Sequence, residues 1–286
     1  MSTPATHVVL EPVSARSDLV HRLRHQWRIL RVIAGMEFKL KYADSALGYV
    51  WSLAKPMALF SVLYVVFGRF FRLGVGFKGY PIYLLIGIVL WTFFLDASTT
   101  TLTSFVARGS LLRRLAFPRL IVPLSTTLTA TITFAVNLIP VVIFVAWNRL
   151  VPQPNWILLV PLLVELYVFT LGVGLVLATL FVRYRDVSQV WELAAQLLFY
   201  ASPIIIPVGF LPPWSQPIAF LNPFVQIMQD VRSIVVYTLP SSATITADER
   251  LAVVGGHLAP VTVALGTLAL GLYLFRRQSP WFAERV

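Results

Sequence analysis

Two carboxylates, Asp96 and Glu165, stand inside long apolar stretches of this chain. At membrane depth a carboxylate is costly, and it usually faces a bundle interior or a water-filled path. One interpretation is a proton relay that uses both residues. The other is a pair of structural carboxylates held by hydrogen bonds. No basic pathway accompanies them inside the apolar stretches, and the sequence leaves both interpretations open.

Other reactive side chains are sparse. The 286 residues include no cysteine, which excludes disulfides, a cysteine-based zinc site and a thiol nucleophile. The four histidines lack metal-ligand spacing, and the twelve acidic residues are too dispersed for a metal-dependent membrane enzyme. There is no G-x-x-x-x-G-K-[ST] phosphate loop, so we expect no ATP hydrolysis by that route. We therefore predict no catalytic residue, metal or cofactor in this chain.

The positive charge gathers in two short segments. Residues 19–41 form an amphipathic pattern whose apolar face includes Trp27, which is typical of a helix lying in a membrane interface. Its basic residues are suited to contacting lipid headgroups, a lipid diphosphate or a soluble partner, and the residues singled out are Arg22, Arg24, Trp27, Arg28 and Arg31.

The second basic segment covers residues 108–118 and ends at a proline. It carries topogenic charge alone, or it is a docking element for a cytoplasmic partner, because its apolar residues would otherwise be exposed. The residues proposed for docking are Arg108, Leu112, Arg113, Arg114, Phe117 and Pro118.

Composition decides the class of the protein. Hydrophobic residues make up 58% and charged residues 12%, about half of the roughly 25% charged share of soluble proteins. Residues 1–18 lack an apolar signal-peptide region and are expected to be a flexible N-terminus. We predict an all-α integral membrane protein with a transmembrane domain at 42–286. Its six spans lie at about 49–71, 81–106, 120–147, 155–182, 187–206 and 258–275.

The orientation follows from the basic residues. With the N-terminus in the cytoplasm, 17 of the 23 lysines and arginines fall on the inner side. The positive-inside rule therefore predicts a multi-pass protein of the cytoplasmic membrane with both termini inside. A tight charged turn formed by Arg183, Arg185 and Asp186 is expected to join the fourth and fifth spans, with Asp186 placed to cap a helix.

Prolines interrupt the apolar segment that follows the fifth span. Broken backbone at membrane depth must be buried or line a cavity. We expect two short re-entrant or surface helices, about 209–219 and 223–237. The alternative is an interfacial loop anchored by Trp214. The residues that mark this segment are Pro203, Pro207, Pro213, Trp214, Asn222 and Pro223.

Several short motifs occur together in a characteristic order. They are Tyr42, Ser45–Trp51 with Pro56, Phe117–Pro118, Arg183–Asp186, Ser202–Pro203 and Asn222–Pro223. In this order and spacing the chain resembles the ABC-2 family of membrane permeases, specifically the polysaccharide and polyol-phosphate exporters. The resemblance covers nearly the whole sequence.

The resemblance implies a permease that forms a homodimer and recruits two copies of a cytoplasmic ATPase, which binds ATP and Mg. Residues 19–41 then correspond to an interface helix, 108–118 to a coupling helix and 207–237 to periplasmic gate helices. The channel entry is expected at Tyr42, Gly48, Tyr49 and Trp51. The implied cargo is a glycan on a polyprenyl diphosphate, of the O-antigen, teichoic acid, capsule or cell-wall galactan type. The polar segment 237–256 is long for the family.

Two other transport functions compete with this one. One is export of a lipid or a small lipophilic drug by the same kind of permease. The other is a proton-coupled flippase that uses Asp96 and Glu165.

Overall fold

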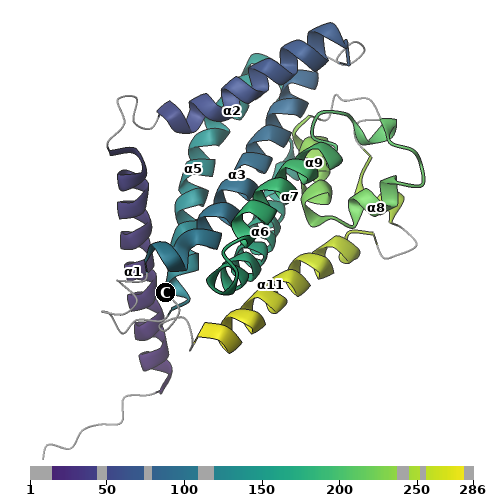
Figure 1. Ribbon diagram of the computed structural model, residues 1–286. Coiled ribbons are helices and arrows are strands. Elements are labelled where there is room, and N and C mark those ends of the chain that lie inside the picture. The colour runs from purple at the N-terminus through teal and green to yellow at the C-terminus, as the bar shows by residue number, and fades with distance from the viewer. Residues whose placement is uncertain are drawn as a thin grey trace, which may run out of the picture.

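The computed structural model describes residues 15–43, 50–73, 79–108, 119–236, 245–251 and 256–279. All regular structure within these ranges is helical (Figure 1). The long helices are α1 (Ala15–Ala43), α2 (Val50–Leu63), α3 (Tyr80–Ala107), α5 (Ile121–Trp147), α6 (Leu159–Arg183), α7 (Val187–Ala201), α9 (Pro223–Val235) and α11 (Leu258–Gln278). The short ones are η1 (Tyr64–Phe70), η2 (Pro154–Leu158), η3 (Val208–Phe210), α8 (Gln216–Phe220) and α10 (Ala247–Arg250).

Five helical segments in the described ranges are long and apolar enough to cross a membrane. They are Val50–Phe70, Tyr80–Ala107, Ile121–Trp147, Pro154–Arg183 and Leu258–Gln278, and they coincide with five of the six expected spans. The remaining one, 187–206, contains α7, which has 15 residues. At 1.5 Å per residue α7 is shorter than the hydrocarbon core of about 30 Å. The count of six therefore stays a prediction.

Helix α3 is the centre of the bundle. In its most apolar window 78% of the residues are buried, compared with at most 39% in any other candidate span. Helices α2, α5, α6, α7 and α9 all pack against it. Trp91 of α3 meets Phe199 of α7 and Phe224 of α9, with ring centroids 5.6 and 5.3 Å apart. This aromatic cluster joins three elements that lie far apart in the sequence.

Helices α6 and α11 come into backbone contact, where Gly172 faces the backbone of Leu268 and Gly271 faces Gly172. A Cβ atom on Gly172 would lie 2.6 Å from the Leu268 nitrogen. Small residues at a crossing let two membrane helices come into backbone contact, which strengthens their van der Waals packing.

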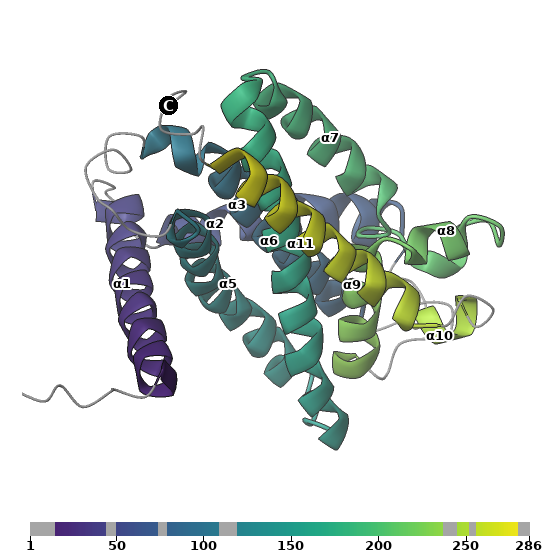
Figure 2. The same cartoon turned by 90° about the horizontal axis from the view of Figure 1, so that it is seen from below.

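The two ends of the bundle carry different attachments. At one end α1 packs against α5 through Leu30 and Ala34, which are both buried. At the other end η3, α8 and α10 share a small apolar cluster of their own, which includes Val208, Phe220 and Leu251. Both views place α1 and the α8–α10 region on opposite sides of the molecule (Figures 1 and 2).

The segment expected to form a helix at 209–219 is arranged differently. It contains η3 and α8 with turns between them. Pro212 and Pro213 fall between the two helices, and neither can donate a backbone hydrogen bond to continue the first one. The second expected helix, 223–237, corresponds to α9, which begins at Pro223 as predicted.

Replacing Gly172 with alanine should destabilise the protein by roughly 1–3 kcal/mol, because the added methyl group meets backbone that cannot move aside. Gly266 of α11 supplies a matched control, since a Cβ there has nothing within 4 Å. Gly266→Ala should be neutral or stabilise by about 0.5–1 kcal/mol through helix propensity. Thermal unfolding of both variants in detergent measures the difference, and equal melting temperatures would contradict the proposed backbone contact.

Candidate functional site

Two ion pairs attach α1 to the bundle. The Nζ atom of Lys41 lies 2.8 Å from an oxygen of Asp96 on α3, and both side chains are about one-third exposed or less. Arg108, at the end of α3, pairs with Glu37 at 2.5 Å. Arg108 also donates to Ser125 on α5. The charge of Asp96 is thus paired with a lysine in the last turn of a different helix, α1.

Next to these pairs lies a polar cavity of about 520 Å³ between α1, α2, α3 and α5. Lys41 and Lys55 supply two positive charges, and Asn137 is buried with its side-chain oxygen lacking a partner in the described part of the chain. The other lining residues are Trp51, Ser52, Pro56, Thr92, Asp96 and Thr133. Cations, an amide and hydroxyls together suit an anionic group that also accepts hydrogen bonds.

A larger groove of about 800 Å³ separates α2 from α7 over the surface of α3. Its aromatic residues are Trp91, Trp191, Phe199 and Tyr200, and its polar residues are Thr92, Thr99, Thr103, Ser188, Glu192 and Gln196. Thr92 lines both this groove and the lysine cavity, so the two spaces adjoin. Aromatic faces interleaved with hydroxyl, amide and carboxylate groups suit a ligand that has apolar faces and many hydroxyls.

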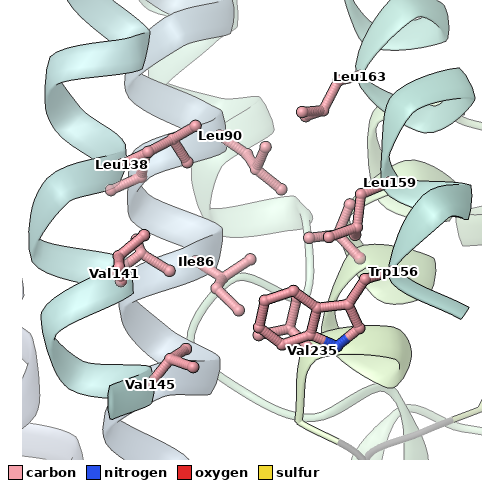
Figure 3. Close-up of a pocket in the computed structure, with 12 residues that line it drawn as sticks. Ile86, Leu90, Leu138, Val141, Val145, Trp156, Leu159, Leu163 and Val235 are labelled. Carbon is pink, nitrogen blue, oxygen red and sulfur yellow. The ribbon is translucent and has the colours of Figure 1, made fainter. Parts of the chain in front are cut away.

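A third cavity, of about 180 Å³, is entirely apolar. It lies between α3, α5, the start of α6 and α9, and Figure 3 shows Ile86, Val141 and Trp156 around it. With no polar group on its lining, it contributes no chemistry and accepts only hydrocarbon.

The most buried charge among the described residues is Arg232 on α9, whose side chain is inaccessible to solvent. Its guanidinium donates to the carbonyl oxygens of Tyr83, Pro203 and Ile204 at 3.0, 2.8 and 2.7 Å. A fourth bond reaches the side-chain oxygen of Gln229, and the guanidinium carbon lies 3.6 Å from the centre of the Tyr83 ring. Neutral acceptors and a ring face therefore replace the carboxylate that a buried arginine usually has.

The Ser202–Pro203 and Asn222–Pro223 motifs both serve this arrangement. Helix α7 ends just before Pro203, and the chain that follows presents the carbonyls of Pro203 and Ile204 to Arg232. At the start of α9 the Asn222 side chain caps the helix by accepting from the Phe224 amide, while Pro223 occupies the first helical position.

A second polar group joins α6, α9, α10 and α11. His257 precedes α11, and its two ring nitrogens lie 2.8 Å from Asp230 and 2.6 Å from Asp248. The hydrogen bond to Asp230 is the main cause that raises the pKa of His257 to about 9, so it is an imidazolium at neutral pH. His257 in turn lowers the pKa of Asp248. Gln226 bridges from Asp230 towards Glu165 on α6.

The structure separates the two carboxylates singled out in the sequence. Asp96 pairs with Lys41 at the α1 end, whereas Glu165 lies near Asp230 and His257 at the α8–α10 end. No hydrogen bond or ion pair joins the two carboxylates among the described residues, and a proton relay through both stays a prediction.

The other predicted residues lie in several parts of the chain. Arg24, Trp27, Arg28 and Arg31 are exposed on α1, and the Arg22 side chain lies outside the described residues. Trp51 lines the lysine cavity, while Gly48, Tyr49 and the Tyr42 side chain are outside the described part, as are Leu112, Arg113, Arg114, Phe117 and Pro118. Arg183 ends α6, and the turn through Arg185 leads to Asp186, which precedes α7 without making a capping bond.

The remaining predicted residues belong to the α8–α10 end. Pro207 precedes η3, Pro213 follows it, and Trp214 is exposed. Sequence reasoning missed Glu37, Asp230, Arg232 and His257. Arg232 is one of the six lysines and arginines that the orientation puts on the outer side, and its position within an apolar segment that has no other basic residue is the signal that could have singled it out.

Replacing Arg232 with lysine should lower the free energy of unfolding by about 3 kcal/mol or more. An ammonium cannot reach the three carbonyls at once, and each buried acceptor left unsatisfied costs about 1–3 kcal/mol. The exposed Arg250 gives a control, since Arg250→Lys should change stability by less than about 0.5 kcal/mol. Thermal unfolding of both variants tests this, and a neutral Arg232→Lys would contradict it.

Comparisons with known proteins agree with this architecture. The family model for the ABC-2 type transporter matches residues 29–236. The O-antigen export system permease protein RfbA of Klebsiella pneumoniae is 27% identical over 215 residues, covering 75% of this chain and 82% of that protein. The protein of the same name from Myxococcus xanthus is 26% identical over 94% of this chain and 99% of its own length.

A more distant relative is named for the transport of another polysaccharide. The polysialic acid transport protein KpsM of Escherichia coli is 22% identical over 241 residues, or 84% of this chain and 89% of that protein. The family match covers well over half of the chain and includes α2, α3, α5, α6, α7 and α9. The chain therefore belongs to the ABC-2 type transporter family of membrane permeases.

Proposed function

We propose that this chain is the membrane subunit of an exporter that moves a polysaccharide, carried on a polyprenyl diphosphate, across the cytoplasmic membrane. Relatives named for O-antigen export and polysialic acid transport support a polysaccharide as cargo. The observation that carries the proposal is the lysine cavity adjoining the aromatic groove, because the pair suits a phosphate group joined to a sugar.

The lysine cavity is the proposed entry for the diphosphate. Lys41 is engaged by Asp96, whereas Lys55 has no ion-pair partner in the described ranges. Lysine binds phosphate as a point charge, and Asn137 and Ser52 add hydrogen-bonding groups nearby. Trp51, at the start of α2, offers a ring face to the first sugar. The isoprenoid chain would remain in the surrounding lipid.

The aromatic groove is the proposed glycan path. Helices α2 and α7, which flank it, expose rows of apolar side chains that α3 does not cover. These are Trp51, Leu59 and Val62 on α2, Val65 on η1, which continues α2, and Val190, Leu193, Leu197 and Tyr200 on α7. A second copy of the chain seated on these rows would close the two grooves into one channel, which supports a homodimer.

Charge supports the orientation. The α1 end carries the exposed arginines of α1 together with Arg108, Arg276 and Arg277. By the positive-inside rule this end faces the cytoplasm, with both termini, and the α8–α10 end faces outward as the gate. Permeases of this family work with an ATPase partner. We place two copies of it, with ATP and Mg, against residues 108–118 and the basic face of α1.

Export of a lipid or a small lipophilic drug is the alternative, and the apolar cavity is the feature that favours it. Stimulation of ATPase activity in the reconstituted complex distinguishes the two. Polysaccharide export predicts a response to a polyprenyl-diphosphate glycan. A response to phospholipid or drug alone would overturn the proposal.

Reversing the charge at the entry should block export. Lys55→Glu places a carboxylate where the diphosphate would bind, and like charges in one cavity cost several kcal/mol, so we expect export to fall at least tenfold. Surface glycan measured in cells that carry the native operon gives the rate, and intracellular lipid-linked glycan should accumulate.

Lys39→Glu is the matched control, since Lys39 is exposed on α1 and does not line the cavity. It should export normally, and both variants should co-purify with the ATPase. Equal export by the two variants would exclude Lys55 from the entry.

The double variant Arg113→Glu, Arg114→Glu tests the docking segment. If these residues meet the ATPase, the reversal should weaken association at least about tenfold, because it introduces like-charge contacts. Co-purification and permease-stimulated ATP hydrolysis measure the effect. The double variant Arg276→Glu, Arg277→Glu, at the end of α11, is the control, and it should retain both the association with the ATPase and the stimulated ATP hydrolysis. Unchanged coupling in the first variant would exclude 108–118 as the docking site.

A further inference from the structure

The polar group around Asp230 contains too few hydrogen-bond donors for its acceptors. Three buried oxygens have no partner among the described residues, one each on Glu165, Gln226 and Asp230. Among the described residues the donors of this group are the amide of Gln226, which is shared by Asp230 and Glu165, and the ring of His257, which is shared by Asp230 and Asp248. Each unsatisfied buried acceptor costs about 1–3 kcal/mol. If all the carboxylates of this group are ionised, the group lacks hydrogen-bond donors for these oxygens.

One more proton would change this balance. An ionised carboxyl only accepts hydrogen bonds, whereas a protonated one also donates. Asp230 forms an ion pair with the His257 imidazolium. Glu165 lies within the apolar span α6 and makes no ion pair among the described residues, so a charge on it is the costly one.

His257 and Asp248 also connect the bundle to α10, which belongs to the polar segment 237–256. Asp248 belongs to α10, and its carboxylate accepts from the His257 backbone at 3.0 Å as well as from the ring. Around α10, Ile245, Ala247 and Leu251 pack on Val208 and Phe220. His257 therefore links the α8–α10 cluster to Asp230 on α9.

We propose that Glu165 binds a proton and that this proton, with the Asp230–His257–Asp248 bridge, forms a latch holding α9 and α10 against α6 and α11. Loss of the proton places a second negative charge beside Asp230 and separates α6 from α9. Loss of the charge on His257 releases α10. Side-chain exposure falls from 67% at Asp248 through 38% at His257 to 6% at Asp230, which is a route for the proton from the solvent.

Among the described residues, the titratable groups that face this latch are Glu165 from α6, Asp230 from α9, Asp248 from α10 and His257 before α11. Arg232 on the same helix as Asp230 is directed to the carbonyls described above and to Gln229. Proton loss from either Glu165 or His257 makes the group more negative, so both events weaken the latch as pH rises.

The sign for His257 follows from its raised pKa. A histidine with a higher pKa in the folded state contributes stability that is fully present below about pH 6.5, the pKa of the unfolded chain. That contribution declines as pH rises and is lost above a pH of about 9. The latch is therefore engaged at acidic and neutral pH and released in alkali.

Infrared spectroscopy of the full-length permease in lipid nanodiscs detects the proton directly. At about pH 7 we expect the carbonyl band of a protonated carboxylic acid, and we expect Glu165→Gln to remove it. Asp96→Asn is the matched control, because Asp96 is ion-paired at the opposite end, and it should keep the band. Absence of the band, or its persistence in Glu165→Gln, overturns the proposal whatever the exported substrate is.

Hydrogen exchange tests the latch in the wild-type chain, so it does not depend on the folding of a variant. Amide protection in 245–251, corrected for intrinsic rates, should fall roughly tenfold or more between about pH 7 and pH 10. In His257→Gln the protection should already be low at about pH 7 and vary little with pH. Protection that stays constant in the wild type, or follows the wild-type profile in His257→Gln, contradicts the latch.

Discussion

A fully buried guanidinium must have its donors satisfied, and this requirement at Arg232 organises much of the structure. The carbonyls that satisfy it come from α3 and from the chain directly after α7, while the arginine itself belongs to α9. Gly87 of α3 leaves room for the guanidinium, since a Cβ there would collide with Arg232. One side chain thereby fixes the end of α7, the position of α9 and the face that α3 presents to both.

The polar residues at the two ends of the bundle attach different elements to it. At the α1 end, the pairs of Glu37 with Arg108 and of Lys41 with Asp96 attach an amphipathic helix to spans and border the proposed substrate entry. At the other end, the bridge through His257 attaches a small helical cluster to the bundle. The two ends are joined by packed helices, which meet through aromatic contacts around Trp91, through the backbone contact of α6 with α11 and through the hydrogen bonds of Arg232.

Much of the fold was predictable because hydropathy and length decide which segments can cross a membrane. Five expected spans agree with helices of the structure, and Pro223 begins α9 as predicted. The length of α7 and the division of 209–219 into two short helices were harder to predict from the sequence. Pro203, Pro212 and Pro213 interrupt helical hydrogen bonding, and where the chain then turns depends on which groups elsewhere in the fold bond to the backbone carbonyls that are left without a partner. The surroundings of Asp96 and Glu165 were missed because the charged groups near them, Lys41 for Asp96 and Asp230 and His257 for Glu165, lie far away in the sequence.

The sequence by itself determined the class of the protein, its helical spans, the clustering of basic residues and the family resemblance, which the family match confirms. These are local or compositional properties, set by the cost of placing backbone and charge in hydrocarbon. The tertiary structure alone decided which charges meet and where cavities form. It buries Arg232, separates Asp96 from Glu165, and brings Lys55 beside Asn137. Such juxtapositions depend on how the helices cross, and helix crossings are set by side-chain packing between segments distant in the chain.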